Sequence, residues 1–367
     1  MISLERSSPS DQRHSHSKGL KMAIKNNAML AFLVGAAASL STASALADPI
    51  SIDIGEGRTV QVEEKLRIAF ITPGSNNLYV QAGILAAKET AEEAGAELTI
   101  LDANWDAGAY FRQLQNVLAS NRYNAVVVEP VDPNQICDIV SKKAADAGVV
   151  AVTVNAPICG RARKTGDEMW TPGTLAHVGG SQTEDAFKRW LDKMVTDNPG
   201  PEKVAILVGP PLAANTLNAI AAIDQVKSEH PEFDIVVVKE AQYLIEEGYN
   251  LAQSILQANP DLTVFAAAYS DVTRGAIQAI KGAGKEGTIE VYDFGGNSWS
   301  IEEIKAGRIA MTSVMLPYSE MATAIQSLAD AWAGKPVKRV YDMADAETVP
   351  GTPLISQGNI DKFTPEF

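Results

Sequence analysis

The stretch NAVVVEPVDPNQICDIV, residues 124–140, runs from an apolar, β-branched segment directly into glutamate, proline and aspartate. A continuous apolar run of this kind is typical of a parallel strand that is covered on both faces. Asp132 followed by Pro133 predicts a helix start, because aspartate is a favoured N-cap and proline is tolerated at the first helical position. Capping does not account for Glu129 at the strand tip, where a carboxylate needs a hydrogen-bond donor from a ligand or a neighbouring loop.

The same unit, an apolar strand followed by a polar segment and an amphipathic helix, repeats along the chain from Lys65 onward. Strands are expected at 65–74, 96–103, 125–131, 149–156, 203–209, 233–241, 263–270, 289–296 and 309–316. The repeats break into two sets near Gly180, which predicts an α/β protein with two doubly wound parallel-sheet lobes. A single TIM barrel is the alternative fold, and it needs about eight regular units in one set.

The segments that follow the strands carry the candidate binding residues, because ligands of doubly wound sheets sit outside the carboxyl ends of the strands. The candidate ligand-binding residues are Asn77, Tyr79, Trp105, Glu129, Asn155, Asn215, Tyr269, Asp293 and Asn297. Several have a structural alternative. Asn77 is also a candidate helix cap, Tyr79 a cover of the core and Trp105 a shield for a helix end. Of Asn215 and Asn218, at least one is expected to cap the helix that begins there.

Motifs for catalysis and cofactor binding are absent from the sequence. No G-x-G-x-x-G follows the first strand, no G-x-S-x-G is present, and GAGKEG (282–287) has Glu286 where a phosphate-binding loop needs a hydroxyl. His177 and His230 lie far apart in the sequence and have no neighbouring cysteine. The sequence therefore offers few residues for a histidine-based metal centre or a catalytic triad. We predict no cofactor, no metal site and no catalytic residues.

Residues 1–47 have the features of a secretory signal peptide: a basic flank, the apolar run AMLAFLVGAAASL (28–40) and an A-x-A-like end at Ala47. Met22 is the expected translation start. The apolar run is too short to span a bilayer comfortably and no second long run follows, so a soluble, exported product is expected. The formal net charge of −14 argues against a nucleic-acid partner. Of two cysteines, Cys137 and Cys159, an oxidising compartment predicts one disulfide, with two buried thiols as the alternative.

Three long segments resemble those of a known protein family: RIAFITPGSNNLYVQAGILAAKETAEEAGAEL (67–98), NVLASNRYNAVVVEPVDPNQICDIVSKKAADAGVVAVTVNAP (116–157) and SILQANPDLTVFAAAYSDVTRGAIQAIKGAG (254–284). Together they resemble the ribose-type, or type I, periplasmic binding proteins, and the resemblance covers roughly residues 65–360. It implies a three-crossover hinge near Gly179–Gln182, Leu316–Pro317 and Val349–Pro353. The implied N-terminal lobe is 65–180 plus 317–350, and the C-terminal lobe is 181–316 plus 351–367, after an extension at 48–64. In this fold the strands before the two cysteines are neighbours, so a disulfide would join two strand ends.

The resemblance implies a periplasmic solute-binding protein of an ABC uptake system, expected to be monomeric, which closes on a solute and presents it to a membrane permease. The alternative is a periplasmic sensor protein that presents its ligand-bound form to a membrane histidine kinase. The sugar-binding pattern is only partly kept. Asn77 and Tyr79 match it, but Asn155-Ala156 stands where sugar binders carry an Asp-Arg pair. Since a pyranose would leave donors unpaired here, we expect a solute that is less polar than ribose or carries different functional groups.

Overall fold

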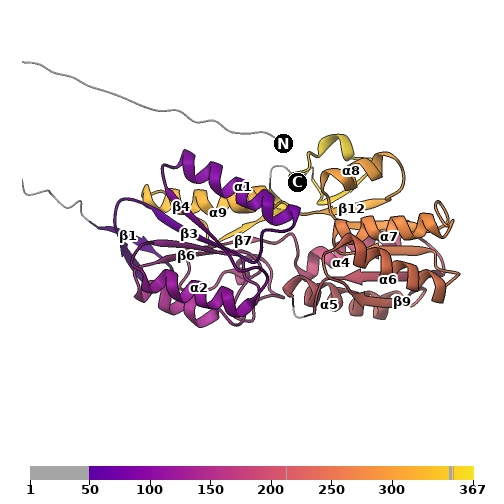
Figure 1. Ribbon diagram of the computed structural model, residues 1–367, viewed down its shortest axis with the longest axis horizontal. Coiled ribbons are helices and arrows are strands. Elements are labelled where there is room, and N and C mark those ends of the chain that lie inside the picture. Colours follow the sequence, from indigo (N-terminus) through magenta and orange to yellow (C-terminus); the bar gives the residue numbers. More distant parts are fainter. Residues whose placement is uncertain (1–48, 212, 347–348, 350) are drawn as a thin grey trace, which may run out of the picture. The chain divides into compact units, whose positions relative to one another are not determined.

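The computed structural model describes residues 49–211, 213–346, 349 and 351–367. The expected signal peptide, residues 1–47, and the expected translation start lie outside these residues. The N-terminal extension forms an antiparallel pair of strands, β1 (Ile50–Asp53) and β2 (Thr59–Val62) (Figure 1). Val60 and Val62 are buried and alternate with exposed residues, so one face of the pair packs on the core. None of the described helices has the length and apolar character needed to cross a membrane.

The first six-stranded sheet defines the N-terminal lobe and has the strand order β13-β7-β6-β5-β3-β4, with every pairing parallel. Its strands are β3 (Arg67–Thr72), β4 (Glu97–Asp102), β5 (Ala125–Val128), β6 (Val150–Asn155), β7 (Ala176–Gly179) and β13 (Val340–Asp342). Its main helices are α1 (Leu78–Glu93), α2 (Ala107–Ala119) and α9 (Pro317–Trp332). Figure 1 shows α1 and α9 on one face of the sheet and α2 on the other. All four residues of β5 are completely buried, as its uninterrupted apolar run predicts.

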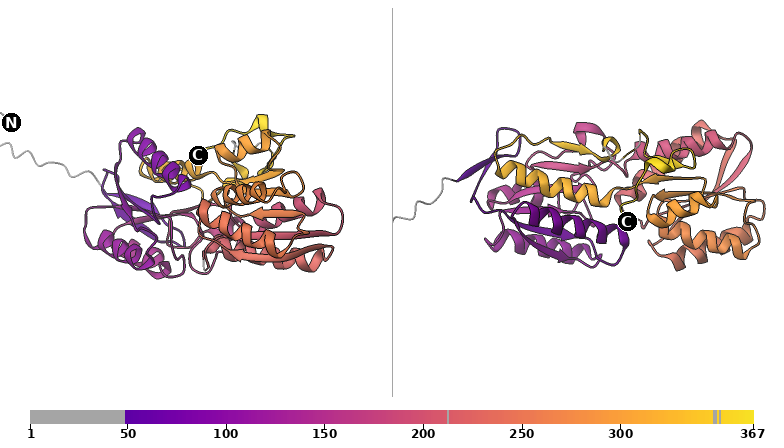
Figure 2. Two further views of the ribbon diagram at one scale, coloured as in Figure 1. Left: turned by 45° about the vertical axis from the view of Figure 1, so that its right-hand side comes forward. Right: turned by 90° about the horizontal axis from the view of Figure 1, so that it is seen from above.

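The second six-stranded sheet defines the C-terminal lobe and has the order β14-β12-β11-β10-β8-β9. Its strands are β8 (Glu202–Val208), β9 (Phe233–Glu240), β10 (Val264–Ala267), β11 (Glu290–Gly295), β12 (Met311–Val314) and β14 (Leu354–Ser356), of which only β14 is antiparallel to its neighbour. Its helices are α4 (Glu184–Asp197), α5 (Ala214–Glu229), α6 (Ile245–Ala258), α7 (Ser270–Gly282) and α8 (Ser298–Lys305). The pair α4–α5 and the pair α6–α7 pack on opposite faces, which is the doubly wound arrangement (Figure 2).

The chain passes between the two sheets three times. It leaves the first sheet after β7 at Gly179, returns between β12 and α9, and leaves again between β13 and β14. The prediction of two doubly wound lobes joined by three crossovers is therefore confirmed, and the TIM-barrel alternative is wrong. The break near Gly180 that separates the two sets of units in the sequence corresponds to the first crossover.

The helix after β5 begins later than the sequence predicts. Asp132 does cap a turn, because its Oδ1 accepts hydrogen bonds from the backbone N–H groups of Asn134 at 2.9 Å and Gln135 at 3.1 Å. Residues 133–136 nevertheless form turns, and the helix begins only at Cys137. Its centre is a π-helix, 139–143, followed by the short α3 (Ala144–Asp146). The Ser141 hydroxyl donates to the Cys137 carbonyl at 2.8 Å, which takes up an acceptor of the first helical turn.

Candidate functional site

Tyr79 is the centre of a buried hydrogen-bond network at the carboxyl end of the first sheet. Its hydroxyl donates to Glu320 Oε2 at 2.5 Å and accepts from Asn155 Nδ2 at 2.6 Å. The other oxygen of Glu320 accepts from the Ser181 hydroxyl at 3.1 Å. Ser181 lies on the first crossover and Glu320 lies in the first turn of α9, directly after the second. The network therefore links α1 and β6 to two of the three hinge segments.

Two buried carboxyl groups lie in this region without a basic partner. Burial, together with repulsion from Glu320, raises the pKa of Glu129 to about 8. Burial also raises the pKa of Glu320 to about 7, although the hydrogen bonds from Tyr79 and Ser181 favour its ionised form. Among the described residues, no group donates a hydrogen bond to the Glu129 carboxyl, which is only 8% exposed. Glu129 thus remains the unexplained carboxylate that the sequence indicates.

Aromatic side chains from both lobes meet near the same strand ends. Trp105, which follows β4, lies 6.5 Å from Tyr243 of the C-terminal lobe between ring centroids, and Tyr243 lies 4.9 Å from Tyr269. Tyr79 makes an edge contact with Phe367 at 5.9 Å. Burial raises the pKa of Tyr269, and a hydrogen bond with the backbone of Tyr79 opposes that rise. The predicted residues Tyr79, Trp105 and Tyr269 are therefore brought together by contacts between the lobes.

Tyr243 and Glu320 were missed by sequence reasoning, for different reasons. Tyr243 follows β9, so the strand-end rule applied to the segment AQYLIEE would have found it. Glu320 belongs to a helix at a crossover and not to a strand end. It meets Tyr79 across 241 residues of sequence, and no local pattern indicates that contact.

Asn215 connects the C-terminal lobe to the first crossover. Its Nδ2 donates to Gln182 Oε1 at 3.1 Å and to the Tyr243 hydroxyl at 2.8 Å. The expectation that Asn215 or Asn218 is the N-cap is wrong, because the N-cap of α5 is Ala213, although Asn215 Oδ1 accepts from Thr216 N at 2.9 Å within the first turn. Asn218 instead donates its amide to the Gln182 carbonyl at 2.9 Å. Both asparagines are thus directed at the crossover segment.

The oxygen atoms of three other predicted residues are bonded within the chain. Asn77 caps α1 by accepting from Val80 N at 2.9 Å, and Asn297 caps α8 in the same way from Ser300 N. Asp293 is fully buried and accepts from three hydroxyl groups, those of Ser270, Thr273 and Thr312, at 3.0, 2.6 and 2.7 Å. Since its acceptors are occupied, Asp293 ties α7 and β12 to β11 at the strand end.

Strained backbone occurs at several of the strand ends. Trp105, Asn155 and Cys159 have φ values of 60°, 63° and 62°, in the left-handed region that residues other than glycine adopt rarely. Such conformations persist where surrounding structure enforces them, and they are enriched at ligand-binding segments. Here they orient the Trp105 ring and the Asn155 amide, two of the predicted site residues.

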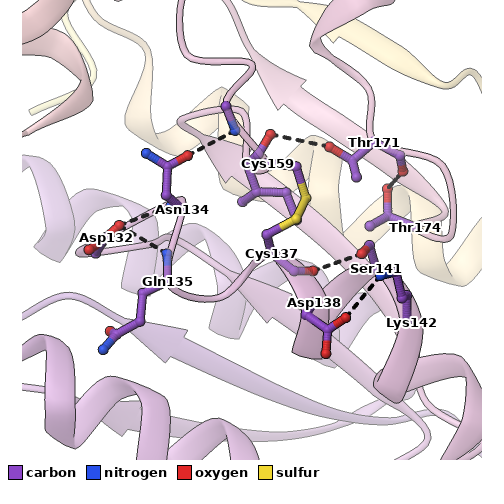
Figure 3. Close-up of a disulfide and its surroundings, with 12 residues drawn as sticks. Asp132, Asn134, Gln135, Cys137, Asp138, Ser141, Lys142, Cys159, Thr171 and Thr174 are labelled. Atoms are coloured by element: carbon purple, nitrogen blue, oxygen red, sulfur yellow. Dashed lines mark hydrogen bonds and ion pairs between the residues drawn. A yellow bond between two sulfur atoms is a disulfide. The ribbon is translucent and has the colours of Figure 1, made fainter.

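The predicted disulfide is present between Cys137 and Cys159, whose Cα atoms are 4.8 Å apart (Figure 3). It joins the start of the helix after β5 to the segment after β6, two neighbouring strands. Asn134 Oδ1 accepts from Gly160 N at 2.8 Å beside it, so the two segments are also joined by a hydrogen bond. The prediction that the bridge connects two strand ends of the N-terminal lobe is confirmed.

Within the part of the chain that the structure describes, one group of side chains has the composition of a metal site: Asp192, Glu229 and His230 on the surface of the C-terminal lobe. Lys188 Nζ lies 2.5 Å from the Asp192 carboxylate and 2.8 Å from that of Glu229. The lysine ammonium therefore already supplies the positive charge that a metal ion would bring. The group lies on helices α4 and α5 and their ends, away from the strand-end network.

The fold and this network define a class: a two-lobed binding protein with polar and aromatic groups gathered where the lobes meet. A family model described as a periplasmic binding protein domain matches residues 68–336, and the chain belongs to that family. The matching curated proteins include the "D-apiose import binding protein" of Actinobacillus succinogenes, 25% identical over 280 residues that cover 75% of this chain and 86% of that one. A "Putative rhizopine-binding protein" of Rhizobium meliloti is 27% identical over 199 residues, 52% of this chain and 59% of that one.

Solved structures have the same fold. A periplasmic solute-binding protein from Actinobacillus succinogenes with bound D-allose gives a TM-score of 0.70 at 22% identity, covering 82% of this chain and 100% of that one. The Caulobacter myo-inositol binding protein gives 0.69 at 20% identity, with 82% and 96% covered. The resemblance to type I periplasmic binding proteins is thereby confirmed. The chain is a solute-binding protein of this family and not an enzyme.

Proposed function

We propose that this protein captures a small, sugar-like solute for an ABC uptake system in the periplasm, after export by its signal peptide. The solute lies between the two lobes, and hinge closure around it creates the form that a membrane permease binds. The relatives named for import support a role in uptake. No observation favours the alternative of a sensor protein for a histidine kinase.

The observation that carries the proposal is the meeting of side chains from both lobes with the hinge. Trp105 and Tyr243 contact each other across the lobes, and Tyr79 is bonded to Glu320 beside two crossovers. A solute that contacts both lobes favours the closed state by as much as its extra contacts in that state. Aromatic faces and a few hydrogen bonds supply contacts of the required strength.

The proposed solute contacts are a subset of the predicted residues together with one that sequence reasoning missed. They are Tyr79, Trp105, Glu129, Asn155, Asn215, Tyr269 and Tyr243. Asn77, Asp293 and Asn297 support these residues from behind, because their oxygen atoms are bonded to backbone or hydroxyl donors of the chain.

Titration calorimetry with purified mature protein tests the proposal. The panel contains D-apiose, D-ribose, D-allose, xylitol and myo-inositol, each also examined by small-angle X-ray scattering. We expect at least one solute of this size to bind with a dissociation constant near 1 μM, about −8 kcal/mol, and to reduce the radius of gyration. Absence of binding by every small solute tried, with unchanged scattering, would contradict the proposal.

A further inference from the structure

No described residue donates a hydrogen bond to the Glu129 carboxyl, a polar group of the proposed site. Glu129 follows β5, a strand in the interior of the first sheet, and is more than nine-tenths buried. The groups that face it electrostatically are Tyr79 from α1, Tyr110 from α2 and Glu320 from α9. None of them is a cation, and the Tyr110 hydroxyl donates to the Ile71 carbonyl at 3.1 Å. A buried carboxylate without compensation is strongly disfavoured, so an ionised Glu129 needs a partner from outside the protein.

The two hydroxyl groups that face this carboxyl, those of Tyr79 and Tyr110, both donate to other acceptors. The Tyr79 hydroxyl donates to Glu320 and accepts from Asn155 Nδ2. A neutral sugar carries hydroxyl groups that both donate and accept, and it needs both kinds of partner. An ionised Glu129 carboxylate offers acceptors only, and an ammonium group, which has only donors, complements it.

The aromatic rings of the site are also free of cations. The described cation–π contacts involve Tyr123, Trp299, Tyr341 and Trp170, which lie outside the group of Tyr79, Trp105, Tyr243 and Tyr269. Aromatic faces attract organic cations by about 0.5–2 kcal/mol, more strongly when water is excluded. The net charge of the chain, −14, favours the approach of a cation over that of an anion.

We propose that the solute carries a protonated amino group, whose N–H donates to the Glu129 carboxylate while its carbon skeleton lies against the aromatic rings. This inference rests on the proposed function and specifies the chemistry of the solute. An amino derivative of a sugar or cyclic polyol is consistent with the sugar-binding relatives. Its ammonium group also supplies the hydrogen-bond donor that the Glu129 carboxylate lacks. Glu129 then acts as the residue that selects amines over neutral polyols.

Binding of a cation beside Glu129 changes the protonation of its carboxyl group. Burial raises the pKa of Glu129 to about 8, so the ligand-free carboxyl holds a proton at neutral pH. Binding of a cation lowers that pKa, and the proton is released to the buffer. Affinity for an amine therefore rises from pH 6.5 to pH 8, while affinity for a neutral polyol does not. Glu320, whose pKa is about 7, titrates in the same range and accepts hydrogen bonds from Tyr79 and Ser181.

Matched pairs of solutes test the inference by calorimetry: D-glucose with D-glucosamine, D-galactose with D-galactosamine, and cyclohexanol with cyclohexylamine. We expect at least one amine to bind about tenfold or more tightly than its neutral partner, as a charge-assisted hydrogen bond implies. The measured heat should depend on the ionisation enthalpy of the buffer, which reports proton release. Binding of neutral solutes alone, from these pairs or from the uptake panel, overturns the amine inference and leaves the proposed function intact. Failure of all solutes in both sets contradicts the proposed function itself.

The Glu129→Gln variant separates charge from shape, because glutamine keeps the size and one acceptor. We expect it to weaken binding of the amine about ten- to hundredfold and to leave the neutral partner within about twofold. In this variant, the rise of amine affinity with pH should also disappear. Glu92→Gln, on the exposed face of α1, is the matched control and should change neither value. Equal weakening of both members of a pair by Glu129→Gln would show a merely structural role and overturn the inference.

Discussion

Glu129, Glu320 and His177 are three buried titratable residues of the N-terminal lobe and its hinge whose burial shifts the pKa in opposite senses. Burial raises the pKa values of the two glutamates to about 8 and about 7, and it lowers that of His177 to about 3. The His177 Nδ1 is hydrogen-bonded to the Thr153 hydroxyl, and its Nε2 has no partner among the described residues. The neutral forms of all three residues are therefore favoured by folding.

We expect the unfolding free energy of the ligand-free protein to fall between pH 6.5 and pH 8. A glutamate with a raised folded pKa contributes stability that is complete below its unfolded pKa of 4.5 and is lost as the pH rises through the folded value. Each such group lowers the free energy by at most about 1.4 kcal/mol per pH unit in that range. His177 acts in the opposite sense, but only below its unfolded value of 6.5.

Urea unfolding at pH 6.5, 7.2 and 8 measures this dependence. Glu320, whose pKa burial raises to about 7, acts in the same direction as Glu129 over this range. The Glu129→Gln variant should therefore show a smaller fall than the wild type, and not a complete loss of it. A wild-type stability that is constant or rises over this range would show that the carboxyls are not held neutral by burial.

Asp293 illustrates a carboxylate whose importance is structural. Thr273 donates to one carboxylate oxygen of Asp293 and Thr312 to the other, so Asp293→Asn places an amide donor against one of these hydroxyl donors. Because a buried, mismatched hydrogen-bonding group costs roughly 1–3 kcal/mol, we expect the unfolding free energy to drop by about that amount. Urea unfolding checks this, with Asp361→Asn in an exposed turn near the C-terminus as the control. A change below about 0.5 kcal/mol would mean that the hydroxyl groups find other acceptors.

At the scale of elements, most of the fold is predictable because its signals are local. Strands such as β5 are uninterrupted apolar runs, and their neighbours carry helix caps at Asn77 and Asp106. The helix after β5 is the exception, because its late start and its π-helical centre depend on contacts distant in sequence. Cys159 is bonded to its first turn, and Arg58 of the extension donates to the Ser141 carbonyl at 3.2 Å. Periodicity within residues 132–146 contains no information on either contact.

Removal of the disulfide should destabilise this helix and the segment after β6 together. In the chain-entropy model, a cross-link that closes a loop of this length, a sequence separation of 22, stabilises the fold by about 3 kcal/mol. We expect the double variant Cys137→Ser, Cys159→Ser to lose about that much unfolding free energy in urea. Wild-type protein that has been reduced and alkylated is the parallel measurement. Two free thiols in exported wild-type protein, detected by mass spectrometry, would contradict the bridge.

At the scale of the whole molecule, the site was only partly predictable because it is assembled from both sheets and the hinge. The strand-end rule identified Tyr79, Trp105 and Tyr269, which do lie in contact networks between the lobes. It did not identify Glu320, whose position depends on where α9 re-enters the first lobe. Asp293 was a candidate through the resemblance, as a partial replacement for an aspartate of sugar binders, and that reasoning does not show which internal donors bond to its carboxylate.

The contact between Trp105 and Tyr243 gives the molecule a way to couple solute binding to closure. A solute must favour closure by roughly 5 kcal/mol to shift a mostly open population to a mostly closed one. An aromatic pair supplies about 0.5–1.5 kcal/mol of such energy beyond its buried area. The Trp105 side chain is itself 39% exposed, so little of the stability of its own lobe depends on it. Its removal should therefore affect closure more than folding.

For Trp105→Ala we expect solute affinity to fall about five- to thirtyfold, equivalent to about 1–2 kcal/mol, while the unfolding free energy changes by less than about 1 kcal/mol. The radius of gyration with saturating solute should still decrease, but the ligand-free protein should be at least as open as the wild type, because one contact between the lobes is lost. Calorimetry, urea unfolding and scattering give the three values. Leu85→Ala, at an exposed position of α1, is the control for removal of a surface apolar side chain. If Trp105→Ala bound solute as tightly as the control, the contact between the two rings would have no part in capture, and closure would depend on the Tyr79–Glu320–Ser181 network alone.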